Sequence, residues 1–122
     1  MYELKYQHKF SAAHKLNDYD GPCANVHGHT WKVDILVKTD SLNNGMVLDF
    51  KDIKKVIDDR FDHKFINDMV TYNPTAENIS KDIYDLILNM LSKLESKDSS
   101  TEVKITVWES DKAGITYYIP KK

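Results

Sequence analysis

Two stretches of alternating residue type constrain the fold of this chain more than any other feature. In Tyr2–His14 every even-numbered position is apolar, aromatic or histidine, and from His27 to Val37 the odd-numbered positions follow the same pattern. A two-residue period is typical of a half-buried strand, because successive side chains point to opposite faces of a sheet. Only a short loop containing Gly21-Pro22 separates the two stretches, so we expect them to be antiparallel neighbours.

Two later segments show helical spacing instead. Asp49 is a candidate N-cap for a helix over residues 50–60, and Thr75 is one for a helix over residues 76–94. Residues 103–107 alternate again, with the inward face continuing to Glu109, and residues 114–119 predict a fourth strand. The order β-β-α-α-β-β predicts an α+β fold with a four-stranded antiparallel sheet and two helices on one face. At 122 residues, without a repeat or a linker-like segment, we expect one domain over residues 1–122.

Composition excludes several classes of protein. The chain has 17 Lys and Arg against 19 Asp and Glu, a net charge of −2, which argues against a general nucleic-acid binder. No stretch approaches the ~18 apolar residues of a membrane span, and the first residues do not resemble a secretory signal. A single cysteine, Cys23, rules out an internal disulfide. We therefore expect a cytoplasmic protein with no membrane or nucleic-acid partner.

Three of the five histidines fall where the first two predicted strands meet. His27 and His29 share a face by parity, and His14 ends the neighbouring strand. Imidazole is a favoured ligand of Zn²⁺, and three such ligands leave one coordination position open, as in catalytic zinc sites. The simpler interpretation is that each ring hydrogen-bonds to a backbone carbonyl, but three converging rings favour a metal. We interpret His8, which lies in mid-strand without an identifiable partner, as an ordinary strand residue.

Four other residues are candidates for chemistry. Cys23 lies four residues before His27. Three roles are open for it: a fourth metal ligand, a thiol of lowered pKa that acts as a base or nucleophile, or an inert buried residue. Asp62-His63 follows the first helix and is a candidate proton-relaying pair, although such dipeptides are often only surface groups. Glu109 has the parity of an inward residue, where an unpaired carboxylate is costly, so we expect it to have a partner such as the N–H groups of a ligand.

In combination, these elements resemble the 6-pyruvoyl tetrahydropterin synthase family, and most closely its 6-carboxy-5,6,7,8-tetrahydropterin synthase branch. The matching motifs span nearly the whole chain, and their order makes the resemblance specific. They are residues 10–14 (FSAAH), 23–29 (CANVHGH), 45–50 (GMVLDF), 62–63 (DH), 73–78 (NPTAEN), 107–110 (VWES) and 113–114 (AG). The three residues between Cys23 and His27 favour the 6-carboxy branch, because the corresponding loop of the animal enzymes is longer.

The resemblance implies a role for each candidate residue. It makes the three histidines His14, His27 and His29 the ligands of a Zn²⁺ cofactor, and it makes Cys23 the residue that abstracts a proton. Asp62 and His63 become the proton-relay partners of Cys23. Glu109 becomes the catalytic-site residue that anchors the pterin ring. It also implies the T-fold, in which the sheets of several subunits join into a barrel, and hence a homo-oligomer, specifically a hexamer.

The implied activity is that of a zinc-dependent lyase of queuosine and 7-deazapurine biosynthesis. Its substrate would be 7,8-dihydroneopterin triphosphate, and its products would be 6-carboxytetrahydropterin, acetaldehyde and triphosphate. The alternatives are a 6-pyruvoyl tetrahydropterin synthase, which keeps all side-chain carbons, and a catalytically silent zinc- or pterin-binding T-fold module. An aldolase or cyclohydrolase of related pterins is a further alternative, which the combination of three histidines and Cys23 disfavours. The segment after Asp111 contains no evident phosphate-binding motif, so the residues that bind the triphosphate are not predicted.

Overall fold

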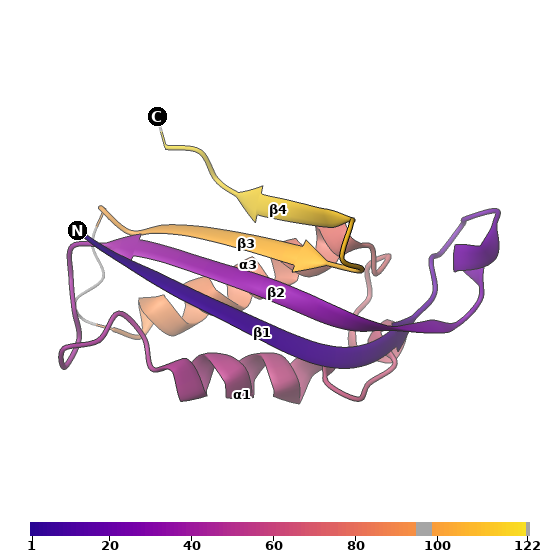
Figure 1. Ribbon diagram of the computed structural model, residues 1–122, viewed down its shortest axis with the longest axis horizontal. Helices are drawn as coiled ribbons and strands as arrows, with labels where there is room; N and C mark the ends of the chain where they lie inside the picture. Colours follow the sequence, from indigo (N-terminus) through magenta and orange to yellow (C-terminus); the bar gives the residue numbers. More distant parts are fainter. Residues whose placement is uncertain (95–98, 122) are drawn as a thin grey trace.

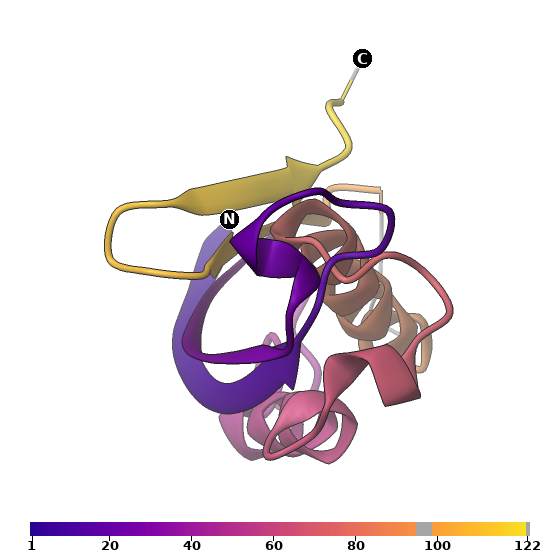
Figure 2. The ribbon, with the colours of Figure 1, turned by 90° about the vertical axis from the view of Figure 1, so that its right-hand side faces the viewer.

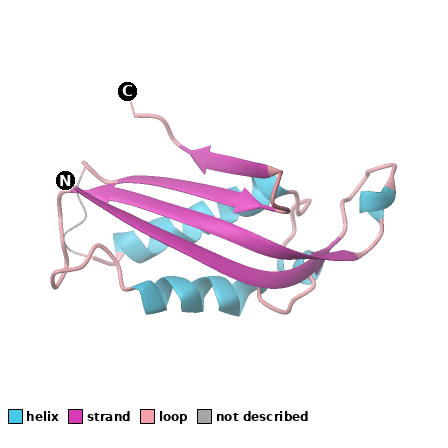
Figure 3. Cartoon of the chain, viewed as in Figure 1, coloured by secondary structure: helices cyan, strands magenta, loops and turns pink. Residues whose placement is uncertain are grey.

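The fold is a four-stranded antiparallel sheet with helices on one of its faces. The computed structural model describes residues 1–94 and 99–121. The strands are β1 (Tyr2–His14), β2 (His27–Thr39), β3 (Glu102–Trp108) and β4 (Gly114–Tyr118), in the order β1-β2-β3-β4. The helices α1 (Phe50–Phe61) and α3 (Ala76–Ser92) lie on the same side of the sheet (Figures 1 and 3). The predicted α+β class, with a four-stranded antiparallel sheet and two long helices on one face, is therefore confirmed.

Both long helices begin directly after the N-cap residues that the sequence predicted, Asp49 and Thr75. The Asp49 side chain accepts a hydrogen bond from the Lys51 amide (2.9 Å), and the Thr75 hydroxyl accepts one from the Asn78 amide (3.1 Å). Both bonds use amides that a helix cannot satisfy internally. Two short elements escaped the sequence prediction: the 3₁₀ turn η1 (Pro22–Ala24) and the one-turn helix α2 (Ile66–Met69). Helix α3 ends at Ser92 rather than at residue 94, and β3 ends at Trp108, so Glu109 follows the strand.

The core lies between the sheet and the two long helices. Inward residues of the strands, among them Trp31, Val33 and Ile105, are fully buried against α1 and α3. Seen from the end of the sheet, the two helices pack side by side against it (Figure 2). The opposite face of the sheet carries the charged and polar residues of the alternation, as is common in antiparallel sheets. None of the described helices is both long enough and apolar enough to cross a membrane.

His8 has a partner that the sequence did not reveal. It is buried on β1, and its Nε2 lies 2.6 Å from Asp58 Oδ1 on α1. Asp58 also accepts a hydrogen bond from the Lys54 ammonium, at 2.7 Å. The imidazole therefore links strand to helix, and its role is structural, in agreement with its interpretation as an ordinary strand residue.

The helices are tied together by a partly buried ion pair. Arg60 of α1 donates two hydrogen bonds of 2.7 Å to Asp82 of α3, and the Tyr72 hydroxyl donates a third to the same carboxylate, at 2.8 Å. The hydrogen bond to Asp82 raises the pKa of the Arg60 guanidinium above its ordinary value. Asp82 is only 9% exposed, so its loss leaves both donors without an acceptor in a partly dry environment.

Asp82→Ala is expected to lower the free energy of unfolding by about 2–3 kcal/mol, the scale for removing one partner of such a pair. Urea denaturation measures the change. Asp85→Ala is the matched control, because the Asp85 carboxylate is exposed and lies 3.9 Å from Lys81. Its loss should change stability by less than about 0.5 kcal/mol. Equal effects of the two substitutions would contradict a stabilising role of the Arg60–Asp82 pair.

Candidate metal centre

Three imidazoles meet at one end of the β1–β2 ladder. The antiparallel register places His14 directly opposite His27 and Ala12 opposite His29, so the three rings lie on the same face of two adjoining strands. One ligand nitrogen from each of His14, His27 and His29 lies within 4.8 Å of the others. The predicted convergence of these histidines is confirmed, and it follows from strand parity together with the register.

Hydrogen bonds to the backbone fix two of the rings. His14 Nδ1 lies 2.7 Å from the Pro74 carbonyl oxygen, and His27 Nδ1 lies 2.7 Å from that of Asn25. Because a carbonyl only accepts, each Nδ1 must carry the proton and donate it. In a neutral ring this leaves Nε2 with its lone pair free. Metal-bound histidines show the same arrangement, in which the second nitrogen donates to a carbonyl or carboxylate.

The Nε2 atoms of the histidines show whether the site suits a bound cation. The Nε2 atoms of His14 and His29 are buried and have no hydrogen-bond partner among the described residues. An unpartnered buried polar atom costs about 1–3 kcal/mol, and two of them side by side are unusual in a folded protein. A cation bound between the rings would satisfy both atoms at once. The donor set, three neutral imidazoles, suits Zn²⁺ and related cations.

Burial favours the neutral, metal-binding form of His14 and His29. Burial lowers the pKa of His14, and the neighbouring His27 and His29 lower it further, against the opposing effect of the Pro74 hydrogen bond. Burial also lowers the pKa of His29. Trp31 stands edge-on to both rings, at centroid distances of 4.9 and 5.2 Å, and forms the apolar floor beneath them. The site is therefore partly dry on its inner side.

Glu109 adds a carboxylate to the same region. It follows β3 directly, and its amide donates a 3.1 Å hydrogen bond to the Ala113 carbonyl, which closes the turn before β4. Its negative charge acts to raise the pKa values of His14 and His29, so it lies within electrostatic reach of the histidine cluster. The structure thus brings together the predicted ring anchor and the predicted metal ligands.

The Asp62-His63 pair lies on the edge of β1, beside the histidines. Asp62 Oδ1 accepts a hydrogen bond from the Ser11 amide (3.0 Å) and lies 3.2 Å from His63 Nδ1. The His63 amide donates to the Ser11 carbonyl (2.7 Å), and its backbone takes a left-handed φ of 58°. This backbone turn lets adjacent side chains meet, which adjacent residues seldom do. The His63 ring is 78% exposed, and it lines the same open hollow as His29.

Cys23 lies apart from the ligand nitrogens. It occupies the η1 turn, where its carbonyl accepts a 2.8 Å hydrogen bond from the Leu16 amide, and its free thiol is half-buried. Within residues 1–94 and 99–121, the group of side chains that converges as metal ligands contains the three histidines and no cysteine. This arrangement favours a free thiol over a fourth ligand that would close the metal centre.

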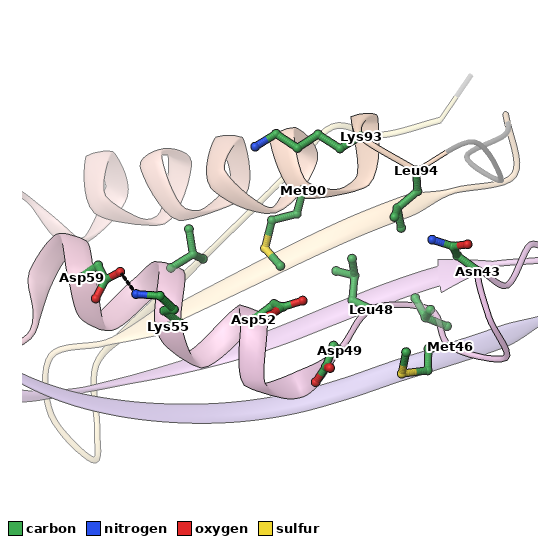
Figure 4. A pocket seen from close by; sticks show the side chains of 12 residues that line it. Asn43, Met46, Leu48, Asp49, Asp52, Lys55, Asp59, Met90, Lys93 and Leu94 are labelled. Carbon is green, nitrogen blue, oxygen red and sulfur yellow. Dashed lines mark hydrogen bonds and ion pairs between the residues drawn. The ribbon is translucent and has the colours of Figure 1, made fainter.

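A second pocket lies at the opposite end of the molecule, between the start of α1 and the end of α3 (Figure 4). Its volume is about 500 Å³, and its walls combine apolar side chains with a charged rim. The apolar residues are Met46, Val47, Leu48, Val56, Met90 and Leu94, and the rim includes Asp49, Asp52, Lys55, Asp59 and Lys93. No residue predicted for the site lines this pocket, so the candidate chemistry is confined to the histidine end.

Sequence reasoning missed the groups that support the ligands. The carbonyls of Pro74 and Asn25 set the tautomers of His14 and His27, and the Trp31 indole forms the floor. Backbone acceptors leave no signal in residue type. The one available hint was the position of Pro74 within the NPTAEN motif, directly before the predicted helix N-cap.

The sheet, the helices on one face and the histidine cluster at one end define a T-fold protein with a candidate metal centre. The chain is similar to the solved 6-pyruvoyl tetrahydropterin synthase of Caenorhabditis elegans, with a TM-score of 0.73 and 25% identity over 98% of this chain and 96% of the other. The family model described as 6-pyruvoyl tetrahydropterin synthase matches residues 3–120. The chain therefore belongs to the 6-pyruvoyl tetrahydropterin synthase family.

The sequence relatives of this chain include proteins with different names. The chain is 36% identical over 117 residues to the 6-carboxy-5,6,7,8-tetrahydropterin synthase of Haemophilus influenzae, across 89% of this chain and 76% of that protein. It is 32% identical over 130 residues to the Bacillus subtilis protein of the same name, across 99% and 87%. A dihydroneopterin monophosphate aldolase of Pyrococcus furiosus is 30% identical over 116 residues, across 90% and 91%. The comparisons thus favour a pterin enzyme and keep the aldolase as a rival.

Proposed function

We propose that this chain is a zinc-dependent 6-carboxy-5,6,7,8-tetrahydropterin synthase, a cytoplasmic lyase of queuosine and 7-deazapurine biosynthesis. Its substrate is 7,8-dihydroneopterin triphosphate, and its products are 6-carboxytetrahydropterin, acetaldehyde and triphosphate. The observation that carries the proposal is the pair of buried, unpartnered Nε2 atoms on His14 and His29, beside His27. The names of the bacterial and archaeal relatives support the choice of reaction.

The protein residues divide the work of binding. His14, His27 and His29 hold the zinc ion, which when bound supplies a Lewis acid that stabilises negative charge on a substrate oxygen. Glu109 accepts hydrogen bonds from the amino and N–H groups of the pterin ring. This contact fixes the ring relative to the histidines, so that binding energy is converted into alignment of the reactive side chain.

Two further groups move protons. The Cys23 side chain, as its thiolate, removes a proton from a side-chain carbon of the substrate. His63 returns protons during the later tautomerisation and bond-cleavage steps. Asp62 orients it, because the carboxylate lies 3.2 Å from His63 Nδ1 and is itself fixed by the Ser11 amide. A positioned acid or base of this kind contributes about 10²–10⁴-fold in rate.

Product analysis distinguishes the proposed reaction from its rivals. Incubation of the zinc-loaded protein with 7,8-dihydroneopterin triphosphate is expected to release acetaldehyde and triphosphate and to leave a 6-carboxy pterin, quantified by mass spectrometry. A 6-pyruvoyl product that retains every side-chain carbon would assign the chain to the pyruvoyl-forming synthases. Release of glycolaldehyde phosphate from dihydroneopterin monophosphate would identify an aldolase, and no turnover of either compound would identify a silent binding module.

We also propose that the chain works as a homo-oligomer, a hexamer by family resemblance. The β4 strand is a sheet edge with exposed residues, and residues 62–65 cover the β1 edge only near Ser11 and Ala13. Within the part of the chain that the structure describes, no strand pairs with the remaining part of the β1 edge or with the outer edge of β4, and pairing with strands of further copies would cover both. Native mass spectrometry of the purified protein is expected to show a hexamer, and a monomer at micromolar concentration would contradict the proposal.

A further inference from the structure

The turn between β3 and β4 carries Glu109, the proposed anchor of the pterin ring. Figure 1 shows this turn at the same end of the sheet as the loop between β1 and β2. The Glu109 amide is bonded to the Ala113 carbonyl, but the Glu109 carboxylate has no hydrogen bond or ion pair with any residue in 1–94 or 99–121. The direction of this carboxylate therefore depends on the backbone that enters the turn at Trp108 and leaves it at Gly114.

Trp108 is the last residue of β3, and its indole is fixed by two contacts. Its Nε1 donates a 2.9 Å hydrogen bond to Asp34 Oδ2 on β2, and Asp34 Oδ1 accepts a 2.8 Å hydrogen bond from Gln7 Nε2 on β1. The Lys32 ammonium lies over the indole, 5.1 Å from the ring centroid. The side chain of Trp108 has therefore lost much of its freedom before any ligand binds.

Gly114 pairs directly with Trp108 in the β3–β4 register, and the indole packs on its backbone. A Cβ atom at residue 114 would lie 2.7 Å from both Cδ2 and Cε3 of the indole, whereas non-bonded carbon atoms pack at about 3.5–4.0 Å. The backbone itself does not require glycine, because the glycines with positive φ are Gly21 and Gly45. The indole is therefore the reason for a glycine here, which gives a role to the Ala113-Gly114 motif of the sequence.

The contact between the indole and Gly114 closes the base of the turn of residues 109–113. A two-residue hairpin turn is held by its own backbone geometry, but a turn of this length depends more on the residues at its base. Successive residues of a strand point to opposite faces of the sheet. With the indole held on the face away from the helices, Glu109 is directed towards the helical face, where its charge reaches His14 and His29.

We propose that Trp108 and Gly114 are positioning residues for Glu109. The indole, packed on the Gly114 backbone and hydrogen-bonded to Asp34, holds the turn so that the Glu109 carboxylate faces the pterin ring. This inference rests on the proposed function, in which that carboxylate accepts hydrogen bonds from the ring. A carboxylate that is already aligned loses less entropy when the ring binds, so the affinity for the ring is higher.

Binding of neopterin to the zinc-loaded full chain tests the proposal. Neopterin is a fluorescent, oxidised pterin that carries the side chain of the proposed substrate without the phosphates, so its Kd reports contacts to the ring and side chain. Trp108→Leu and Gly114→Ala should each raise this Kd about tenfold, the scale of one misaligned hydrogen bond to a charged group. Fluorescence anisotropy measures the Kd, and metal analysis should find the zinc content of the unmodified chain in both variants.

The matched control is Thr106→Val, on the same strand and the same sheet face as Trp108. It removes the 2.7 Å contact between the hydroxyls of Thr106 and Thr116, which joins β3 to β4 further from the turn. This substitution should change the Kd less than about twofold.

Two double-mutant cycles show whether these residues act through one another. Glu109→Gln should weaken binding, and adding Trp108→Leu to it should raise the Kd by less than about a further twofold, because the indole acts through Glu109. Gly114→Ala should likewise have little effect in the Trp108→Leu background, where no indole meets the added methyl group. A residue that only stabilised the end of the sheet would weaken binding independently of Glu109.

Unchanged Kd values in Trp108→Leu and Gly114→Ala, beside a weakened Glu109→Gln, would overturn this inference alone. Independent effects of Trp108→Leu and Glu109→Gln, or equal weakening by Thr106→Val, would also overturn it. An unchanged Kd in Glu109→Gln, or no binding of neopterin by the unmodified chain, would refute the pterin anchor itself and this inference with it. Gly114→Ala adds a single methyl group, so it decides the test if thermal unfolding shows that Trp108→Leu does not fold.

Discussion

Replacing His29 by alanine is expected to abolish bound zinc and, with it, turnover of the pterin substrate. Two imidazoles would remain where three now converge within 4.8 Å. Loss of a supporting residue outside the ligand set already weakens metal binding about 10–100-fold, so loss of a ligand should weaken it by more than about 100-fold. Metal analysis after dialysis measures zinc per chain, and the product assay measures the rate.

The control for this variant is His8→Gln, because His8 lies on β1 on the same sheet face as His14. Its imidazole is buried like that of His14 but is bonded to Asp58, and it should be dispensable for zinc. The thermal shift on adding zinc separates metal loss from misfolding. The unmodified chain should be stabilised by zinc, since a cation bound only to the folded state stabilises it, whereas His29→Ala should show little shift. One zinc per chain in His29→Ala would exclude the proposed ligand set.

Replacing Cys23 by alanine is expected to have the second-largest effect, a fall in turnover of about 10²–10⁴-fold with zinc content unchanged. The expected separation of the two readouts rests on geometry. The thiol is half-buried on the η1 turn, and it lies outside the group of side chains that converges on the metal within the described part of the chain. Single-turnover kinetics on the zinc-loaded variant measure the rate of the proton-abstraction step.

Cys23→Ser refines this test, because a serine hydroxyl keeps the size of the side chain but ionises far less readily than a thiol. We expect it to be nearly as slow as Cys23→Ala. Loss of zinc from both variants would make Cys23 a ligand and the centre a closed, structural one. Full activity of Cys23→Ala would refute a catalytic role and leave the thiol as a small buried side chain.

Much of the fold could be predicted because residue parity fixes it. A strand that buried the odd-numbered residues of Tyr2–His14 would place Lys5 and Lys9 in the core, so only one face assignment is compatible with the sequence. The same alternation predicted that the three histidines lie on the inner face of the sheet. Their convergence could be predicted because the short loop between the first two strands makes those strands neighbours. The caps at Asp49 and Thr75 were equally local signals.

The parts that escaped prediction depend on contacts between distant segments. Helix α2 is one turn long and has too few residues to show a period. The meeting of Asp62 with His63 depends on a left-handed backbone at residue 63, which hydrogen bonds to Ser11 hold in place. Residue type alone does not predict this conformation, although histidine adopts it more often than most residues. Asp58, the partner of His8, lies fifty positions further along the chain. The roles of Cys23, Asp62, His63 and Glu109 remain predictions that the substitutions and product analysis address.

The hydrogen bond from His14 to the Pro74 carbonyl has a consequence for the order in which the molecule matures. The hairpin of β1 and β2 carries all three imidazoles and can form early during synthesis, but the carbonyl that directs the His14 proton to Nδ1 arrives sixty positions later. A ribosome-bound hairpin therefore lacks the acceptor that prepares this ring for a cation. We therefore expect the three imidazoles to be fully oriented for a cation only once the segment that carries Pro74, directly before the N-cap of α3, has docked against β1.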